Sequence, residues 1–305
     1  MAYLSLGAAC LLFSMQFLFS KGYQLRAKNG FRSALWMATL DGAYFFLLFF
    51  PLNGFQIQMT ASSALYGAIF SFSALACNVA SYFAMERGKV AVVTLFTLSG
   101  GLLLPLLYGV ICLKERMGPG RWAGALLVLL SFFPGALWGD RTVEKQAAPL
   151  PKQAVFWLLC ILVFMSNGVG AVAAKAHAVS AQSVPERDFL LFAALLRLGA
   201  GSLFLAGQKL NRRRADSSVE TKQRDCLWLV LLVGGFTLCN GIGNLFSLSA
   251  ARSLAASLQF PLLSGVVVAL SALFSRGIYK EKLSPGDLLG LAMTGAGVTL
   301  MIVCG

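Results

Sequence analysis

Charged side chains are scarce in this sequence, and acidic ones are the scarcest. The 305 residues include 25 lysines and arginines but only 12 aspartates and glutamates, so that 12% of the chain is charged. A soluble globular protein is about a quarter charged. Hydrophobic residues make up 58% of the chain, more than one soluble core of this length can hide behind so few charges. These numbers exclude a soluble globular enzyme, a fibrous protein and a disordered scaffold, and they predict a chain solvated by lipid.

Residues for catalysis, metal binding and phosphate binding are nearly absent as well. The chain holds a single histidine, His177, which we place in a loop. The only Gly-Lys pair, Gly88-Lys89, is followed by Val90, so the sequence has no phosphate-binding loop. The seven cysteines show no C-x-x-C spacing and lie mostly in apolar runs, which indicates buried small side chains rather than disulfides or a metal site. We therefore expect neither an enzyme nor a cofactor.

Apolar runs long enough to cross a bilayer occur about ten times. Only helices satisfy their own backbone hydrogen bonds in lipid, and a span needs roughly 20 residues. We therefore predict an all-α integral membrane fold with ten transmembrane helices in the cell (inner or plasma) membrane. The predicted spans are 2–20, 33–51, 62–85, 90–112, 120–138, 154–174, 188–206, 226–250, 254–278 and 286–304.

Two halves of the chain repeat each other. The run from Lys114 to Gly120, followed by Gly124, matches the run from Lys280 to Gly286, followed by Gly290, at a constant offset of 166 residues. We predict a first five-helix repeat at 1–138, a linker at 139–153 and a second five-helix repeat at 154–305. Because five is odd, the second unit enters the membrane upside down, and such inverted repeats are typical of secondary transporters.

Both copies of the repeat also carry a G-x-x-x-G pattern, Gly120 with Gly124 and Gly286 with Gly290. Such pairs let helices approach closely, either within one chain or between two. Packing within the chain is the better interpretation, because ten helices already form a complete pseudo-symmetric unit. We expect a monomer or a weak homodimer.

The motifs resemble the drug/metabolite transporter superfamily in its ten-helix EamA-like form, over nearly the whole chain. Lys114 and Lys280 stand where that family usually has glycine, and Phe96 stands in its proline position in the first half. The resemblance implies export or exchange of small metabolites, amino acids, sugars or amphiphilic compounds. The segments that carry it are Leu113–Arg116, Tyr279–Lys282, Ser249–Arg252 with Phe260–Leu262, Phe13–Gln16 leading to Lys21, and Asn167-Gly168 leading to Lys175.

Two charges lie deep inside predicted spans. Asp41 is nine residues past Arg32, roughly 13 Å into the second span. Arg197 lies equally far past Asp188 in the seventh span, which is the matching helix of the other repeat. Because a buried charge in a membrane is costly, we expect the two to meet across the interface of the halves. They form either a coupling or gating pair or a structural ion pair, unless Arg197 snorkels to a nearby interface.

Uncharged polar residues inside the spans are the candidates for substrate binding. Each must face protein or water, since an amide in hydrocarbon needs a partner, and packing between helices is an equally good explanation for any one of them. Together with Asn240 they predict a largely uncharged polar cavity with aromatic walls, suited to a zwitterion, a sugar or a hydrophobic cation. In the resembled family, the helices that carry them line the cavity. The candidates are Gln16, Asn78, Tyr82, Ser99, Asn167, Asn244, Ser247, Gln259 and Ser264.

The net charge is +13, but the positions of the basic residues indicate membrane topology rather than a nucleic-acid partner. They sit in short groups between apolar runs, where lysine and arginine mark cytoplasmic loops. Loops after odd-numbered spans hold 18 of the 25, which favours both termini outside, whereas the family resemblance implies both inside. The loops after even-numbered spans hold six: Lys114, Arg116, Arg121, Lys175, Arg187 and Arg252.

Two further acids belong to the repeated motif. Glu115 and Glu281 each precede a helix that begins with proline, so we interpret them as helix-end residues whose charge complements the dipole of that helix. The sequence as a whole predicts a secondary transporter that moves a small organic solute across the lipid bilayer by alternating access. A passive channel or a membrane scaffold that moves nothing remains the alternative.

Overall fold

The computed structural model describes residues 1–27, 31–85, 87, 90–134, 150–212, 223–279 and 284–303. Within these residues the chain is helical and contains no strand. The lysine-containing repeat segment at 280–283, with Glu281, lies outside the described residues, as do Cys304 and most of the predicted linker. The helices are α1 (Ala2–Arg26), α2 (Phe31–Leu52), α3 (Ala61–Met85), α4 (Val90–Ile111), α5 (Pro119–Leu130), α7 (Leu150–Val179), α8 (Glu186–Arg212), α9 (Gln223–Ser253), α10 (Ala256–Tyr279) and α11 (Pro285–Val303).

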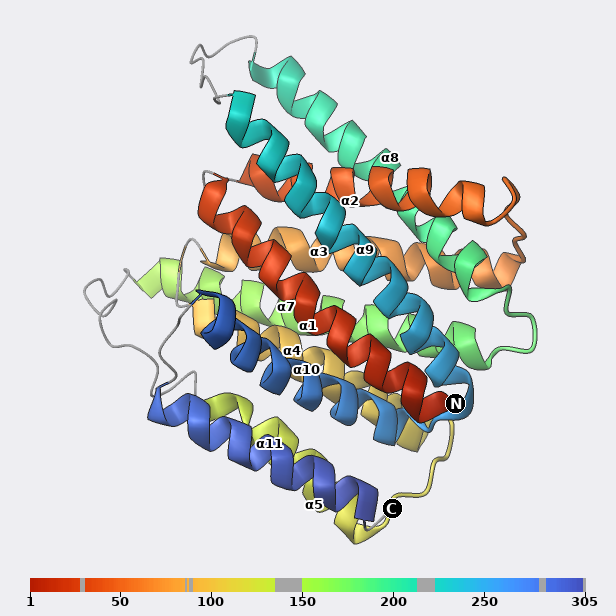
Figure 1. Cartoon of the computed structure of the whole chain (residues 1–305), viewed down its shortest axis with the longest axis vertical. Helices are drawn as coiled ribbons and strands as arrows, with labels where there is room; N and C mark the ends of the chain where they lie inside the picture. The colour runs from red at the N-terminus through yellow and green to blue at the C-terminus, as the bar shows by residue number, and fades with distance from the viewer. Residues whose placement is uncertain are drawn as a thin grey trace.

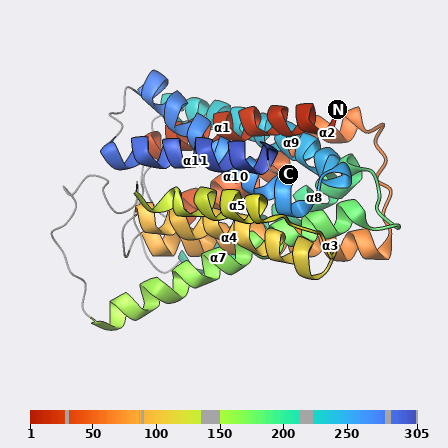
Figure 2. The same ribbon diagram turned by 90° about the horizontal axis from the view of Figure 1, so that it is seen from below.

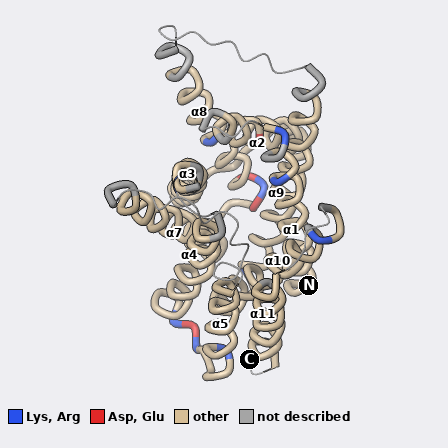
Figure 3. Tube along the Cα trace, turned by 90° about the vertical axis from the view of Figure 1, so that its left-hand side faces the viewer, with Lys and Arg blue, Asp and Glu red and all other residues tan. Residues whose placement is uncertain are grey.

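Eight of the described helices are long and apolar enough to cross a membrane, namely α1 to α4 and α7 to α10. Their outer faces carry large apolar side chains, such as Leu203 of α8, which is 75% exposed, and Leu4 of α1, which is 73% exposed. In Figure 3, which looks nearly along the helices, lysine, arginine and acidic residues occupy only short stretches of the trace. The chain therefore has the fold of a multi-pass helical membrane protein, whereas ten spans remain a prediction.

The helices lie side by side in one bundle (Figures 1 and 2). The central helices cross-pack, with α1 against α9 and α10, and α7 against α3 and α4, while α4 also contacts α10. The pair α2 and α8 lies at one edge of the bundle, and the pair α5 and α11 at the other (Figure 1). This arrangement leaves six helices, α1, α3, α4, α7, α9 and α10, around the centre.

Helix α5 ends at Leu130, residues 132–134 are helical again, and the predicted end of this span near residue 138 lies outside the described residues. The Ser131 hydroxyl donates a hydrogen bond to the Val128 carbonyl at 2.6 Å and accepts one from the Thr294 hydroxyl of α11 at 2.8 Å. The backbone at Ser131 also lies close to α11, since a Cβ on Gly290 would come 2.7 Å from the Ser131 carbonyl oxygen. The end of α5 is thus fixed by its partner helix.

Glycines of the predicted G-x-x-x-G pairs pack inside the chain. A Cβ on Gly124 would come 2.6 Å from the Gly297 carbonyl oxygen of α11, and Gly290 packs on Ser131. Both glycines therefore bring α5 and α11 together, as expected for packing within one chain. The cysteine prediction also holds for Cys10, Cys77, Cys160 and Cys239, which are buried and free, whereas the fifth described thiol, Cys112, is exposed.

The tightest crossing joins α4 to α7, and it predicts a stability effect. A Cβ on Gly100 would overlap the carbonyl oxygen of Phe164. We expect Gly100→Ala to lower the free energy of unfolding by about 1–3 kcal/mol, because the two backbones must move apart. Thermal unfolding in detergent measures this effect. The matched control is Gly199→Ala, where a Cβ meets nothing within 4 Å; equal melting temperatures for the two variants would contradict the close crossing.

Candidate functional site

A cavity of about 220 Å³ lies among the six central helices. Phe13 of α1, Phe70 of α3 and Gly101 of α4 face residues of α7, α9 and α10 across it. Its walls are mostly apolar, with Phe260 and Leu263 of α10 beside the polar groups. A concave, mainly apolar site with a few polar groups is the usual form of a small-molecule site.

Five of the nine predicted binding residues line this cavity: Asn167, Asn244, Ser247, Gln259 and Ser264. Gln16 and Ser99 do not line it; the Gln16 Oε1 and the Ser99 hydroxyl are buried elsewhere without a partner in the described part of the chain. Asn78 is exposed on α3, and the side chain of Tyr82 lies outside what the structure describes. The sequence therefore located the cavity on the correct helices but did not fix which faces turn inward.

The amide side chains in the cavity donate to the protein itself. Asn167 donates its Nδ2 to the Thr97 carbonyl at 2.7 Å. Asn244 donates to the carbonyl and to the Oδ1 of Asn240, both at 2.8 Å. Gln259, which is fully buried, donates its Nε2 to the Ser247 carbonyl at 2.9 Å, and its Oε1 has no partner among the described residues. What these groups have left to offer is their amide oxygens and the second N–H of Asn167.

Lys175 is a charged cavity residue that the sequence analysis placed in a loop. Helix α7 continues to Val179, five residues beyond the predicted end, so Lys175 lies inside the helix and is only 2% exposed. Its Nζ donates to the Ala251 carbonyl at 2.5 Å and to the Leu254 carbonyl at 2.6 Å. Since Lys175 lines the cavity, the expectation of a largely uncharged cavity needs correction: one ammonium stands at its edge.

Glu115 caps a different helix from the one expected. Lys114 adopts a positive φ of 55°, and the Glu115 carboxylate that follows accepts the backbone N–H groups of Ala256 at 2.7 Å and Ser257 at 2.8 Å. It therefore neutralises the N-terminus of α10, in the other half of the chain, rather than that of α5. Glu115 and Lys175 together fix the corner between α9 and α10, each with the charge that suits its helix end.

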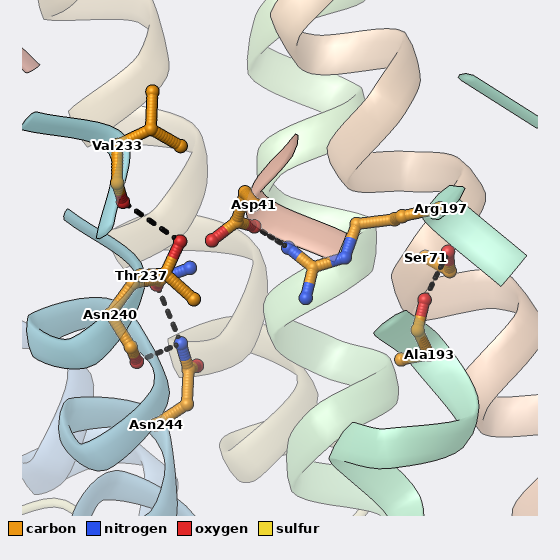
Figure 4. Close-up of polar contacts among 8 residues, drawn as sticks. All are labelled: Asp41, Ser71, Ala193, Arg197, Val233, Thr237, Asn240 and Asn244. Carbon is orange, nitrogen blue, oxygen red and sulfur yellow. Dashed lines mark hydrogen bonds and ion pairs between the residues drawn. The ribbon is translucent and has the colours of Figure 1, made fainter. Parts of the chain in front are cut away.

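Asp41 and Arg197 meet, as the sequence predicted. The Arg197 Nη1 donates to the Asp41 Oδ2 at 2.8 Å, and the two side chains are 11% and 4% exposed, respectively. The Asp41 Oδ1 and the Arg197 Nε find no partner within the described residues. Figure 4 shows the Asp41 carboxylate between Arg197 on one side and Thr237 and Asn240 of α9 on the other. The pair joins α2 to α8 and reaches the helix that lines the cavity.

His177 also differs from the prediction, because it is not in a loop. It lies in α7, is fully buried, and stacks on Phe189 of α8 with ring centroids 4.0 Å apart. Its two ring nitrogens have no hydrogen-bond partner in the part of the chain that the structure describes. The ring therefore packs as an aromatic side chain between α7 and α8.

Comparisons with known proteins identify the fold and no family. No family model matches the chain, and no curated protein is similar to it. Among solved structures, the chain is similar over 99% of its length to a crystal structure of a protein, of which it covers 96%, with 19% sequence identity and a TM-score of 0.73. At that identity the likeness shows that the two chains share this helical bundle.

Proposed function

We propose that this protein is a secondary transporter that moves a small organic solute across the cell membrane by alternating access. The observation that carries the proposal is the cavity, which is lined by six helices, three from each half of the chain. A site between two halves can be exposed to either side in turn when the halves rock against each other.

The helix packing supports two inverted repeats of five helices. If α1, α2, α3, α4 and α5 are exchanged for α7, α8, α9, α10 and α11, most contacts map onto contacts. The packing of α1 on α9 becomes that of α7 on α3, and α1 on α10 becomes α7 on α4. Helices α2 and α8, α4 and α10, and α5 and α11 pack on their own counterparts. Helices α1 and α7 also begin at opposite ends of the bundle (Figure 1), as an inverted pair requires.

The interactions between the halves suit a protein with two states. Asp41 in the first half binds Arg197 in the second, and Glu115 in the first binds the N-terminus of α10 in the second. Each is a discrete polar contact that can be made in one state and broken in another. We assign the chain to the EamA-like branch of the drug/metabolite transporter superfamily on its sequence motifs, and we propose a monomer or weak homodimer without a cofactor.

Counterflow in proteoliposomes tests the transport proposal. Liposomes that contain the protein are loaded with an unlabelled mixture of amino acids, sugars, nucleosides and hydrophobic cations, and labelled solutes are offered outside one at a time. We expect one chemical group to accumulate transiently and saturably, because a carrier exchanges solute through one site. Protein-free liposomes and liposomes without internal solute are the controls. Flux that does not saturate would identify a channel instead, and no flux of any solute would identify a scaffold.

A further inference from the structure

We propose that the cavity takes a small apolar zwitterion, a molecule that carries a carboxylate and a primary ammonium close together, with the carboxylate at Lys175. This inference rests on the proposed transport function and names its substrate class. It is drawn from the hydrogen-bonding groups that the protein leaves unused in the cavity, from the charge already present there, and from the size of the cavity.

The acceptors in the cavity suit a ligand with several hydrogen-bond donors, such as a primary ammonium. Asn244 and Gln259 donate both N–H bonds of their NH₂ groups to protein oxygens, so their remaining groups are amide oxygens, which only accept, whereas Asn167 keeps one N–H beside its amide oxygen. The Gln259 Oε1 is fully buried and has no partner among the described residues. A buried acceptor without a donor is costly, and a primary ammonium offers three N–H groups to satisfy such oxygens.

Lys175 supplies the complementary group for an anion. An ammonium has three N–H donors, and the Ala251 and Leu254 carbonyls take two of them, which leaves one for a ligand. Because Lys175 lines the cavity together with the amide side chains, its ammonium can bind a carboxylate while the amide oxygens bind the ammonium of the ligand. A charge-assisted hydrogen bond of this kind is stronger than a neutral one.

The charge balance favours a ligand with no net charge. Glu115 and Lys175 carry opposite charges and both bind the corner between α9 and α10, so the site is close to neutral before a ligand enters. A hydrophobic cation would be repelled by Lys175, and a simple anion would leave an unbalanced negative charge inside the membrane. A zwitterion keeps the site neutral and satisfies both the ammonium of Lys175 and the amide oxygens.

The size and the walls of the cavity indicate a short apolar substituent. Its volume of about 220 Å³ is below the usual range for drug-sized ligands. Phe13, Phe70, Phe260 and Leu263 form the apolar part of the wall. A zwitterion with a branched aliphatic side chain, such as leucine or valine, fits both the polar and the apolar surfaces.

Three matched compounds test the inference on the unaltered protein: leucine, the amine that lacks its carboxylate, and the carboxylic acid that lacks its amine. Binding is measured by thermal shift and by competition for leucine counterflow. We expect leucine to bind at least tenfold more tightly than either analogue, because each analogue leaves one set of charged hydrogen bonds unmade. Equal binding of the amine or of the acid, or no binding of leucine, overturns the zwitterion.

Variants then identify the carboxylate site. Lys175→Met, which keeps the length of the side chain without the charge, should weaken leucine binding at least tenfold while the affinity for the amine analogue rises. Arg252→Met is the matched control, because Arg252 is a cation at the same end of the bundle that binds Glu186 and does not line the cavity. If Lys175→Met does not fold, the ranking of the three compounds on the unaltered protein still decides the proposal. Counterflow of a different solute without leucine binding would reject the zwitterion and retain the transporter, whereas leucine binding without any flux would reject the transporter alone.

Discussion

Replacing Arg197 by methionine is expected to lower the free energy of unfolding by about 3–5 kcal/mol, because it leaves the Asp41 carboxylate buried without its partner. The Asp41 side chain is only 4% exposed and has one other oxygen, Oδ1, which already lacks a hydrogen bond within the described residues. Within the described part of the chain, no other cation forms an ion pair with Asp41. Thermal and chemical unfolding in detergent measure the loss.

The double variant Asp41→Asn with Arg197→Met is the control for this prediction. It removes both charges, so it should recover most of the stability that Arg197→Met alone has lost. Together with Asp41→Asn alone, the double variant completes a cycle that measures the coupling energy between the two residues. If the double variant is as unstable as Arg197→Met, the loss of stability comes from packing rather than from an unpaired charge. The ion pair then does not stabilise the contact between the two halves.

Asp41→Asn alone separates the coupling role from the structural role. Asp41 is the one acid that the sequence places deep in a span, and its free Oδ1 lies toward Thr237 and Asn240 of α9 (Figure 4). If Asp41 carries protons during transport, Asp41→Asn abolishes the pH dependence of counterflow, because an amide cannot titrate. Unchanged pH dependence together with lower stability would reject that role and leave a structural ion pair.

The meeting of Asp41 and Arg197 could be predicted because the energy at stake is large and local. A charge deep in a span is costly without a partner, and the repeat placed one acid and one base at matched depths in the second helix of each half. Strong penalties leave few arrangements, so two residues 156 positions apart could be paired from the sequence alone.

Lys175 could not be recognised as a buried residue, because the same penalty predicts that a span ends before a charged residue. The sequence therefore predicts a loop at Lys175 and His177. The segment around Lys175 is rich in alanine, a strong helix former, and the helix continues to Val179. The buried ammonium is stabilised by the carbonyls of Ala251 and Leu254 at the end of α9. These residues are more than 70 positions from Lys175, so the sequence around Lys175 does not predict the contact.

The sequence also could not predict which face of each helix turns toward the cavity. Helices that contact lipid on one side and protein on the other are apolar all round, so a polar residue does not reveal which side it occupies. The Ser99 side chain of α4 does not line the cavity, whereas Gly101, two residues later and so on the opposite face of the helix, does. Glu115 shows the same limit for loops, since its role at a helix end was predicted correctly but the helix that it caps lies in the other half of the chain.

Glu115→Ala is expected to open the end of the cavity that lies at the corner between α9 and α10. The variant removes two charge-assisted hydrogen bonds to the Ala256 and Ser257 N–H groups, each worth roughly 1.5–3 kcal/mol. It also removes the contact between the α4–α5 loop and the first turn of α10. A shift of only about 1.4 kcal/mol changes the ratio of closed to open molecules tenfold, so the closed state should lose most of its population.

Labelling of a cysteine in the cavity measures that opening. The seven native cysteines are replaced, Ser264→Cys is introduced in the cavity wall, and a membrane-impermeant thiol reagent is added from the side of the α9–α10 corner. We expect Glu115→Ala to speed labelling at least tenfold, and Glu115→Gln to have a smaller effect because its amide oxygen still accepts. The control Glu186→Ala removes an acid at the same end that binds Arg252 instead of α10. Equal labelling rates with Glu115→Ala and Glu186→Ala would show that the Glu115 contact does not close the cavity, because loss of any acid at that end would then have the same consequence.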